Sequence, residues 1–137
     1  MKKLMMVIVA LILMMNTSFS QSRISTSYDE LLKEYPLGEY VSQDTTDDGQ
    51  KYITVQYSNY DATHYFNNSD YVTITAIFYK DSKSLNKKIQ SLNDMYVCEA
   101  KNEEDHGLRW ADYSFGYIIT IKFIATDNLQ VIRYSVD

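Results

Sequence analysis

The chain has little of the residue types that give small proteins their cross-links, sharp turns and reactive centres. Its 137 residues include one cysteine, one proline, four glycines, one tryptophan and two histidines. Because Cys98 is alone, an internal disulfide framework is excluded and the fold must depend on a hydrophobic core. No glycine-rich phosphate loop, Gly-x-Ser-x-Gly nucleophile elbow or His-Glu-x-x-His metal helix is present, which argues against the enzyme classes that use them.

Apolar runs long enough to cross a membrane are also absent. The longest apolar block, residues 4–15, is shorter than the roughly 20 residues that a spanning helix needs. It follows Lys2 and Lys3 and precedes Ser18-Phe19-Ser20, so small residues stand at the third and the last position before a cleavage point. These features predict a Sec-type signal peptide over residues 1–20.

The remaining residues, 21–137, suffice for a single domain with one core. Gln21 stands where a bacterial lipoprotein has its lipidated cysteine, so we expect a soluble periplasmic or extracellular protein with no membrane anchor after cleavage. The formal net charge is −5 and becomes more negative when Lys2 and Lys3 are removed. This acidity argues against nucleic acid and anionic membranes as partners.

Two segments have the apolar period of an amphipathic helix. The first starts at the capping box Ser27-Tyr28-Asp29-Glu30 and ends at Pro36. The second starts with Asp81 or Ser82 as its N-cap. The apolar positions are Tyr28, Leu31, Leu32 and Tyr35 in the first helix and Leu85, Ile89 and Leu92 in the second, whose solvent side carries Lys83, Lys87 and Lys88.

Eight further segments alternate between apolar and polar residues, as strands with one buried face do. They are residues 40–43, 51–58, 63–66, 71–80, 96–101, 108–113, 117–124 and 129–136. Turns such as Asp47-Asp48-Gly49 and Asn67-Asn68-Ser69-Asp70 join them, and strands joined by short turns pair antiparallel. The predicted fold is therefore α+β, with an antiparallel sheet of about 6–8 strands and two helices on one face.

The two halves of the domain, residues 27–80 and 81–137, follow the same plan at an offset of about 56 to 58 residues. Tyr40-Val41 corresponds to Tyr96-Val97, and each pair is followed by an acidic turn that contains a glycine. This pattern predicts a tandem repeat of one helix and four strands. Because few residues are identical, a chance similarity between two amphipathic patterns is the alternative explanation.

Strict alternation along the strands sorts their side chains into two layers. The layer expected beneath the helices consists of Ile53, Val55, Tyr57, Val72, Ile74, Ala76, Phe78, Ile119, Ile121, Phe123, Ile132, Tyr134 and Val136. The opposite layer consists of Tyr52, Thr54, Gln56, Tyr71, Thr73, Thr75, Ile77, Tyr79, Thr120, Lys122, Val131 and Arg133. Its tyrosines suit recognition of a protein or a sugar. The alternative is that tyrosine simply suits half-exposed strands through cross-strand pairing.

The order of these elements, together with Leu85-Asn86, Tyr96-Val97 and Trp110, resembles a family of small, functionally uncharacterised secreted proteins of gut-type bacteria. That resemblance extends over residues 52–136 and implies no known activity. The repeated plan of a helix and four strands is also similar to the β-lactamase inhibitor protein fold, whose open sheet grips a partner protein. The chain lacks the disulfides of that family, so inhibitory activity is not implied.

The remaining reactive residues suggest two kinds of chemical site. Cys98 with His64 or His106 would form a thiol–imidazole pair, although a small buried thiol in mid-strand is the simpler explanation of this cysteine. The acidic segment 44–49 looks like a calcium loop, but Val55 occupies the position where an EF-hand loop has its bidentate glutamate. We therefore predict a solvated turn in which the glycine adopts a positive φ.

The sequence as a whole predicts a secreted, non-enzymatic binding module that holds a protein, peptide or glycan on the open face of its sheet. The predicted contact residues are Tyr52, Tyr71, Thr73, Tyr79, Trp110 and Arg133. No metal and no cofactor are expected. One alternative is a self-associating structural protein that buries the same face in a homodimer. The other is a small hydrolase or a thiol enzyme built on Cys98.

Overall fold

The computed structural model describes residues 22–99, 108–126 and 129–136 of the chain. The predicted signal peptide, His106 and Gly107 lie outside these residues. The elements follow one another as α2 (Tyr28–Glu34), β1 (Val41–Thr45), β2 (Lys51–Gln56), β3 (Tyr60–Phe66), β4 (Val72–Tyr79), α3 (Ser82–Met95), β5 (Cys98–Glu99), β6 (Arg109–Asp112), β7 (Ile119–Ala125) and β8 (Gln130–Val136). Among the described residues, no helix has the length and apolar character that crossing a bilayer requires.

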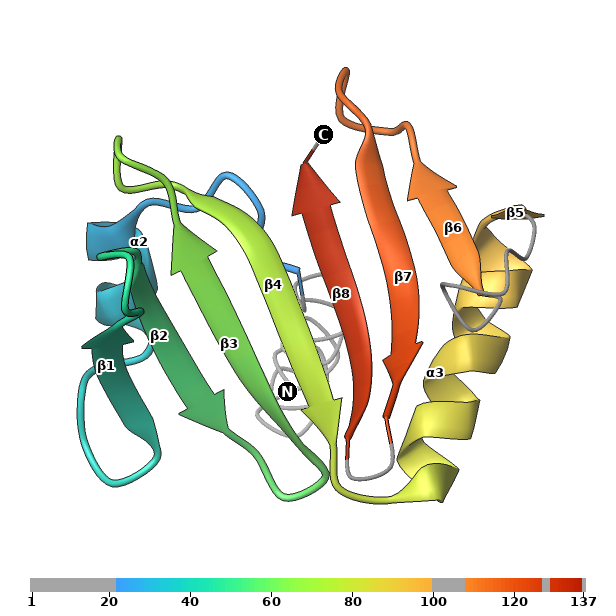
Figure 1. Ribbon diagram of the computed structural model, residues 1–137, viewed down its shortest axis with the longest axis horizontal. Helices are drawn as coiled ribbons and strands as arrows, with labels where there is room; N and C mark the ends of the chain where they lie inside the picture. The colour runs from blue at the N-terminus through green and yellow to red at the C-terminus, as the bar shows by residue number, and fades with distance from the viewer. Residues whose placement is uncertain (1–21, 100–107, 127–128, 137) are drawn as a thin grey trace, which may run out of the picture.

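The strands form one open antiparallel sheet in the order β1-β2-β3-β4-β8-β7-β6-β5 (Figure 1). Seven strands have four to eight residues, and β5 is a two-residue strand at one edge. Each helix precedes a run of four strands, and the two runs meet where β4 pairs with β8. The predicted α+β class with an antiparallel sheet and two helices is thus confirmed, while a duplication behind the two halves stays a prediction.

Helix α2 has only seven residues, too few to be stable without contacts to the sheet. The predicted capping box is present, because the Ser27 side chain accepts a hydrogen bond from the Glu30 backbone and the Glu30 side chain accepts one from the Ser27 backbone. Leu31, the one buried residue of the helix, packs against a cluster on β2, β3 and β4. The cluster consists of Ile53, Val55, Phe66 and Val72.

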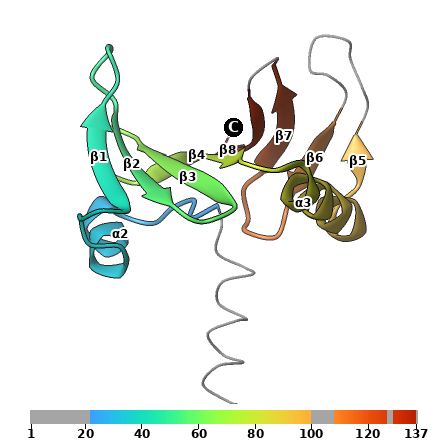
Figure 2. The ribbon, with the colours of Figure 1, turned by 90° about the horizontal axis from the view of Figure 1, so that it is seen from below.

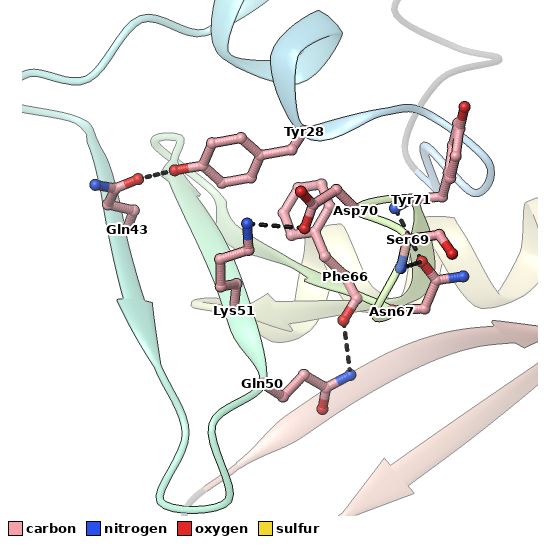
Figure 3. A network of polar contacts seen from close by, with 9 residues as sticks. All are labelled: Tyr28, Gln43, Gln50, Lys51, Phe66, Asn67, Ser69, Asp70 and Tyr71. Carbon is pink, nitrogen blue, oxygen red and sulfur yellow. Dashed lines mark hydrogen bonds and ion pairs between the residues drawn. The ribbon is translucent and has the colours of Figure 1, made fainter.

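Polar contacts fix the first turn of α2 to the sheet (Figure 3). The Tyr28 hydroxyl donates to the Gln43 side chain on β1, and its ring meets the Phe66 ring edge-on at 5.1 Å. The Lys51 ammonium on β2 lies 4.5 Å from the centroid of the Tyr28 ring and 2.8 Å from a carboxylate oxygen of Asp70. Three strands and one turn therefore hold the same tyrosine, which places α2 over the β1–β3 end of the sheet.

Helix α3 covers the other end of the sheet. Asp81 is its N-cap, as predicted, and accepts a hydrogen bond of 2.7 Å from the Ser84 backbone. Leu85 and Leu92 pack against a cluster that includes Trp110, whose indole N–H donates to Asn93 at 2.9 Å. The predicted solvent position of one lysine is wrong. Lys88 is half-buried, with its ammonium 5.9 Å from the centroid of the Tyr134 ring.

A β-bulge at Thr73 changes which side chains of β4 lie beneath the helices. Tyr65 pairs with Ile74, whereas the next residue, Phe66, pairs with Val72, so Thr73 is an extra residue in the ladder. The strict alternation assumed for this strand is therefore wrong after Val72. Val72 faces the helices as predicted, but the rest of the strand is inverted. Thr75, Ile77 and Tyr79 lie on the helix side, whereas Ile74, Ala76 and Phe78 lie on the opposite side.

The short helix α2 gives a test of this packing. Leu31 is 0 % exposed, so Leu31→Ala should lower the free energy of unfolding by about 2–5 kcal/mol. Lys33→Ala on the exposed side of the same helix should change it by less than about 0.5 kcal/mol. Urea unfolding followed by tryptophan fluorescence measures both. Equal effects of the two substitutions would contradict the assigned orientation of the helix.

Candidate functional site

The sheet face opposite the helices is the candidate site, and we refer to it as the open face. Both helices lie on one side of the sheet, and no described element covers the other side (Figure 2). The two ends of the sheet bend away from the helices, so the open face is concave (Figure 2). By strand register the open face includes Asp44, Tyr52, Thr54, Asp61, Thr63, Tyr65, Ile74, Ala76, Phe78, Arg109, Thr120, Lys122, Ile124, Val131 and Arg133.

Two of the predicted contact residues lie on the open face. Tyr52 on β2 is half-buried, and its ring centroid is 5.5 Å from that of Tyr65 on β3. Arg133 on β8 is also half-buried and is paired in register with Lys122 and Ala76. These residues lie in different halves of the sheet, because β2 is next to the β1 edge whereas β8 pairs with β4 at the centre.

The other four predicted contacts lie elsewhere. Tyr71 is 49 % exposed but pairs with Ser27, at the start of α2, in an isolated bridge. Thr73 is the half-buried bulge residue. Tyr79 packs against the core beneath the helices, and Trp110 is 0 % exposed. The placement of Tyr79 was wrong because the bulge inverts the strand. The placement of Trp110 was wrong because its indole fills the core under α3.

Four tyrosines pack in a row on the helix side, and of these Tyr79 was expected on the open face. The ring centroids of Tyr35 and Tyr57 are 6.5 Å apart, those of Tyr57 and Tyr60 are 4.7 Å apart, and those of Tyr60 and Tyr79 are 5.8 Å apart. Burial raises the pKa of the Tyr57 hydroxyl above its ordinary value. This row of rings bridges the space between α2 and α3, so cross-strand packing explains these four residues better than recognition does.

Sequence alternation missed several apolar residues of the open face. Tyr65 on β3 and Ile74 and Phe78 on β4 are half-buried there, together with Ile124 on β7. The pKa of the Tyr65 hydroxyl is raised by burial and, to a lesser extent, by Tyr52. The bulge hid the two β4 residues, and no turn signal in the sequence marks it.

Three cations cross the open face side by side on β6, β7 and β8. Arg109 pairs in register with Lys122, and Lys122 pairs with Arg133. We call these three residues the basic row. The same cross-strand line ends on β5, where Glu99 pairs in register with Arg109. At the other end, Asp61 on β3 is neutralised by the Lys80 ammonium at 3.1 Å.

The buried histidine belongs to the helix side and not to a catalytic pair. His64 is 2 % exposed, and its Nδ1 lies 2.8 Å from the Thr75 hydroxyl. Because that hydroxyl donates to the Ser22 carbonyl, the His64 Nδ1–H is the donor to Thr75. Burial and, secondarily, the charge of Arg23 lower the pKa of His64 to about 4.

The proposed thiol–imidazole pair with His64 is not formed. His64 lies on β3, whereas Cys98 lies on β5, which is the far edge of the sheet. The expected burial of Cys98 is also wrong, because this two-residue edge strand leaves the residue exposed. The pairing with His106 falls outside the described residues.

The acidic segment 44–49 is a turn stabilised by its own side chains. The Thr46 hydroxyl accepts a hydrogen bond of 3.0 Å from the Gln50 backbone and donates to the Asp48 carboxylate. Gly49 has the predicted positive φ, at 89°. Over the part of the chain that the structure describes, no three His, Cys, Asp or Glu side chains come together as metal ligands.

A hollow of about 330 Å³ lies on the helix side of the sheet, between the end of α3 and the β6–β7 turn. Its polar centre is Asp112, which accepts hydrogen bonds from the Tyr96 hydroxyl at 3.0 Å and from the Ser114 backbone at 2.9 Å. Burial and this carboxylate raise the pKa of Tyr96 to about 12. The Ser114 hydroxyl also donates a hydrogen bond to the Asp112 carboxylate. Among the described residues, no histidine lies between this hydroxyl and the carboxylate as a general base would. These contacts join the end of α3 to the end of β6 and provide no activated nucleophile.

Comparisons with family models, curated proteins and solved structures gave no match to this chain. The resemblances noted from the sequence therefore stay predictions.

The buried histidine predicts a pH dependence of stability. The folded protein keeps His64 neutral down to pH about 4, whereas the unfolded chain binds a proton below the ordinary value of 6.5. Stability should therefore fall by up to about 3 kcal/mol as the pH is lowered from 6.5 to 4. Urea unfolding at several pH values measures this loss. His64→Gln should remove most of that slope, and equal slopes for both proteins would contradict the assignment.

Proposed function

We propose that the chain is a secreted, non-enzymatic binding module that holds a protein, peptide or glycan on the open face of its sheet. The observation that carries the proposal is the one-sided arrangement of the fold. Both helices pack on the same side, and the concave opposite side, which crosses the whole sheet, is covered by no described element (Figure 2). Secretion enters the proposal from the predicted signal peptide alone.

The side chains of the open face support recognition. Tyr52 and Tyr65 form an aromatic pair with hydroxyl groups, and Ile74 and Phe78 supply apolar area beside it. Tyrosine and arginine are the residue types that contribute most to protein interfaces, because each combines a large contact area with hydrogen-bonding groups. Arg133 adds such a group at the centre of the sheet, where β8 pairs with β4.

Shape argues against the self-associating alternative. Two concave faces leave a void between them when they meet, whereas interfaces are packed about as densely as protein interiors. The open face therefore fits a convex partner better than a second copy of itself. A thiol enzyme built on Cys98 and His64 loses support because these two residues lie on distant strands.

The proposal predicts that partner capture depends on the aromatic pair of the open face. Tyr52→Ala/Tyr65→Ala should lower the affinity for the captured partner about 30-fold or more, because truncating central interface aromatics commonly costs about 2 kcal/mol or more. The measurement is quantitative capture from the native secretome with immobilised mature protein, followed by titration of the recovered partner.

The matched control is Tyr113→Ala/Phe115→Ala, which removes two exposed aromatic rings from the β6–β7 turn. This control should capture the same partner as the wild type. Circular dichroism and urea unfolding must show that both variants are folded. If the two double variants and the wild type recover the same partner with the same affinity, the open face is not the binding site.

A further inference from the structure

We infer that the hollow between the end of α3 and the β6–β7 turn binds a small monocarboxylate with an apolar body, whose carboxylate pairs with the Lys88 ammonium. The inference goes beyond the proposed function, because the hollow lies on the helix side of the sheet and the open face is the other side. It comes from the position of Lys88, from the lack of a counter-charge there and from the walls of the hollow.

Lys88 occupies a position of α3 that an apolar residue ordinarily fills. Residues three and four apart share one face of a helix, and Lys88 follows the buried Leu85 by three residues and precedes the buried Leu92 by four. Its side chain is half-buried, whereas Lys83 and Lys87 on the same helix are exposed. Lysine is rarely removed from water without a charged partner, because the ammonium then loses its hydration. A counter-charge is therefore expected beside Lys88.

The described residues supply no such counter-charge. No carboxylate in the described part of the chain lies within ion-pair distance of the Lys88 ammonium. Its neighbour is the Tyr134 ring, whose centroid at 5.9 Å is near the limit of about 6 Å for a cation–π contact. Burial lowers the pKa of Lys88, which shows that the surroundings disfavour its charge. A bound anion would remove that disadvantage.

Among the described residues that line the hollow, the one carboxylate is engaged elsewhere. One oxygen of Asp112 accepts a hydrogen bond from the Tyr96 hydroxyl, and the other accepts from the backbone and the hydroxyl of Ser114. Asp112 also limits the charge of the ligand, because it would repel a second negative group. The hollow therefore suits a single carboxylate near Lys88 and disfavours polyanions.

Five apolar side chains line the hollow beside these polar groups. Leu92 on α3, Ile119 on β7 and Tyr134 on β8 are buried, whereas Met95 and Phe115 are exposed. The buried three therefore form the deep wall, and the exposed two lie on the solvent side. A volume of about 330 Å³ is in the range of pockets that hold small molecules. An organic acid can cover this apolar wall, which an inorganic anion would leave uncovered.

The first test compares ligands that differ in one feature. Octanoate, octan-1-ol, 3-phenylpropionate and inorganic phosphate are each titrated into the mature protein by isothermal calorimetry. Octanoate should bind at least about tenfold more tightly than octan-1-ol, because only the acid forms the ion pair. It should also bind more tightly than phosphate, which has no apolar body. Binding of either acid supports the inference, and the tighter acid shows whether an alkyl or an aromatic body fits. No binding of both acids, or octan-1-ol binding as tightly as octanoate, overturns it.

A matched pair of variants tests the role of Lys88. Lys88→Met should lower the octanoate affinity about tenfold or more and leave that for octan-1-ol nearly unchanged, so the preference for the acid disappears. Lys87→Met makes the same change of charge at the adjacent exposed position and should keep the preference. Equal losses in the two variants overturn the inference. Lys88→Gln serves as the second variant if circular dichroism shows that Lys88→Met is unfolded.

The open-face variant distinguishes this inference from the proposed function. Tyr52→Ala/Tyr65→Ala changes the other side of the sheet, so this variant should bind octanoate as tightly as the wild type does. Loss of octanoate binding in the folded variant would place the acid on the open face and overturn the inference. Octanoate binding that depends on Lys88 supports the inference even if partner capture is the same in this variant and in the wild type, a result that would overturn the proposed function alone.

Discussion

The one-sided arrangement of this fold depends on a single extra residue in β4. Val72 and Ile77 are five positions apart, so in a regular strand they would point to opposite faces. The bulge at Thr73 puts both on the helix side, where Val72 joins the cluster around Leu31 and Ile77 joins the cluster around Leu85. Both helices can therefore cover the same side of the sheet, and the other side stays open.

The bulge also determines the character of the open face. With the strand inverted, Ile74 and Phe78 move from the core layer to the open face, while Tyr79 moves in the other direction. The open face thus exchanges a phenol for apolar area next to Arg133 and becomes less like a polar solvated surface. An apolar floor beside charged groups is the composition of a protein interface, and it is this exchange that favours a protein partner over a sugar.

Local signals in the sequence predicted the elements well, because each signal has a local cause. The cap at Ser27, the cap at Asp81 and the turn at Gly49 depend on residues within one turn of the chain. Face assignment failed where it depended on register. Nothing near Thr73 marks a bulge, and Val72, Ile74, Ala76 and Phe78 are all apolar, so alternation assigned all four to the buried layer. The edge position of Cys98 depends on strand order, which adjacent residues do not encode.

The basic row has its effect at contact distance and not at long range. The protein is acidic overall, and at physiological ionic strength its net charge is screened beyond about 8 Å. Half-buried cations in a concave face are screened much less once a partner excludes water. Such charges contribute to the choice of partner and to its register more than to the rate of encounter.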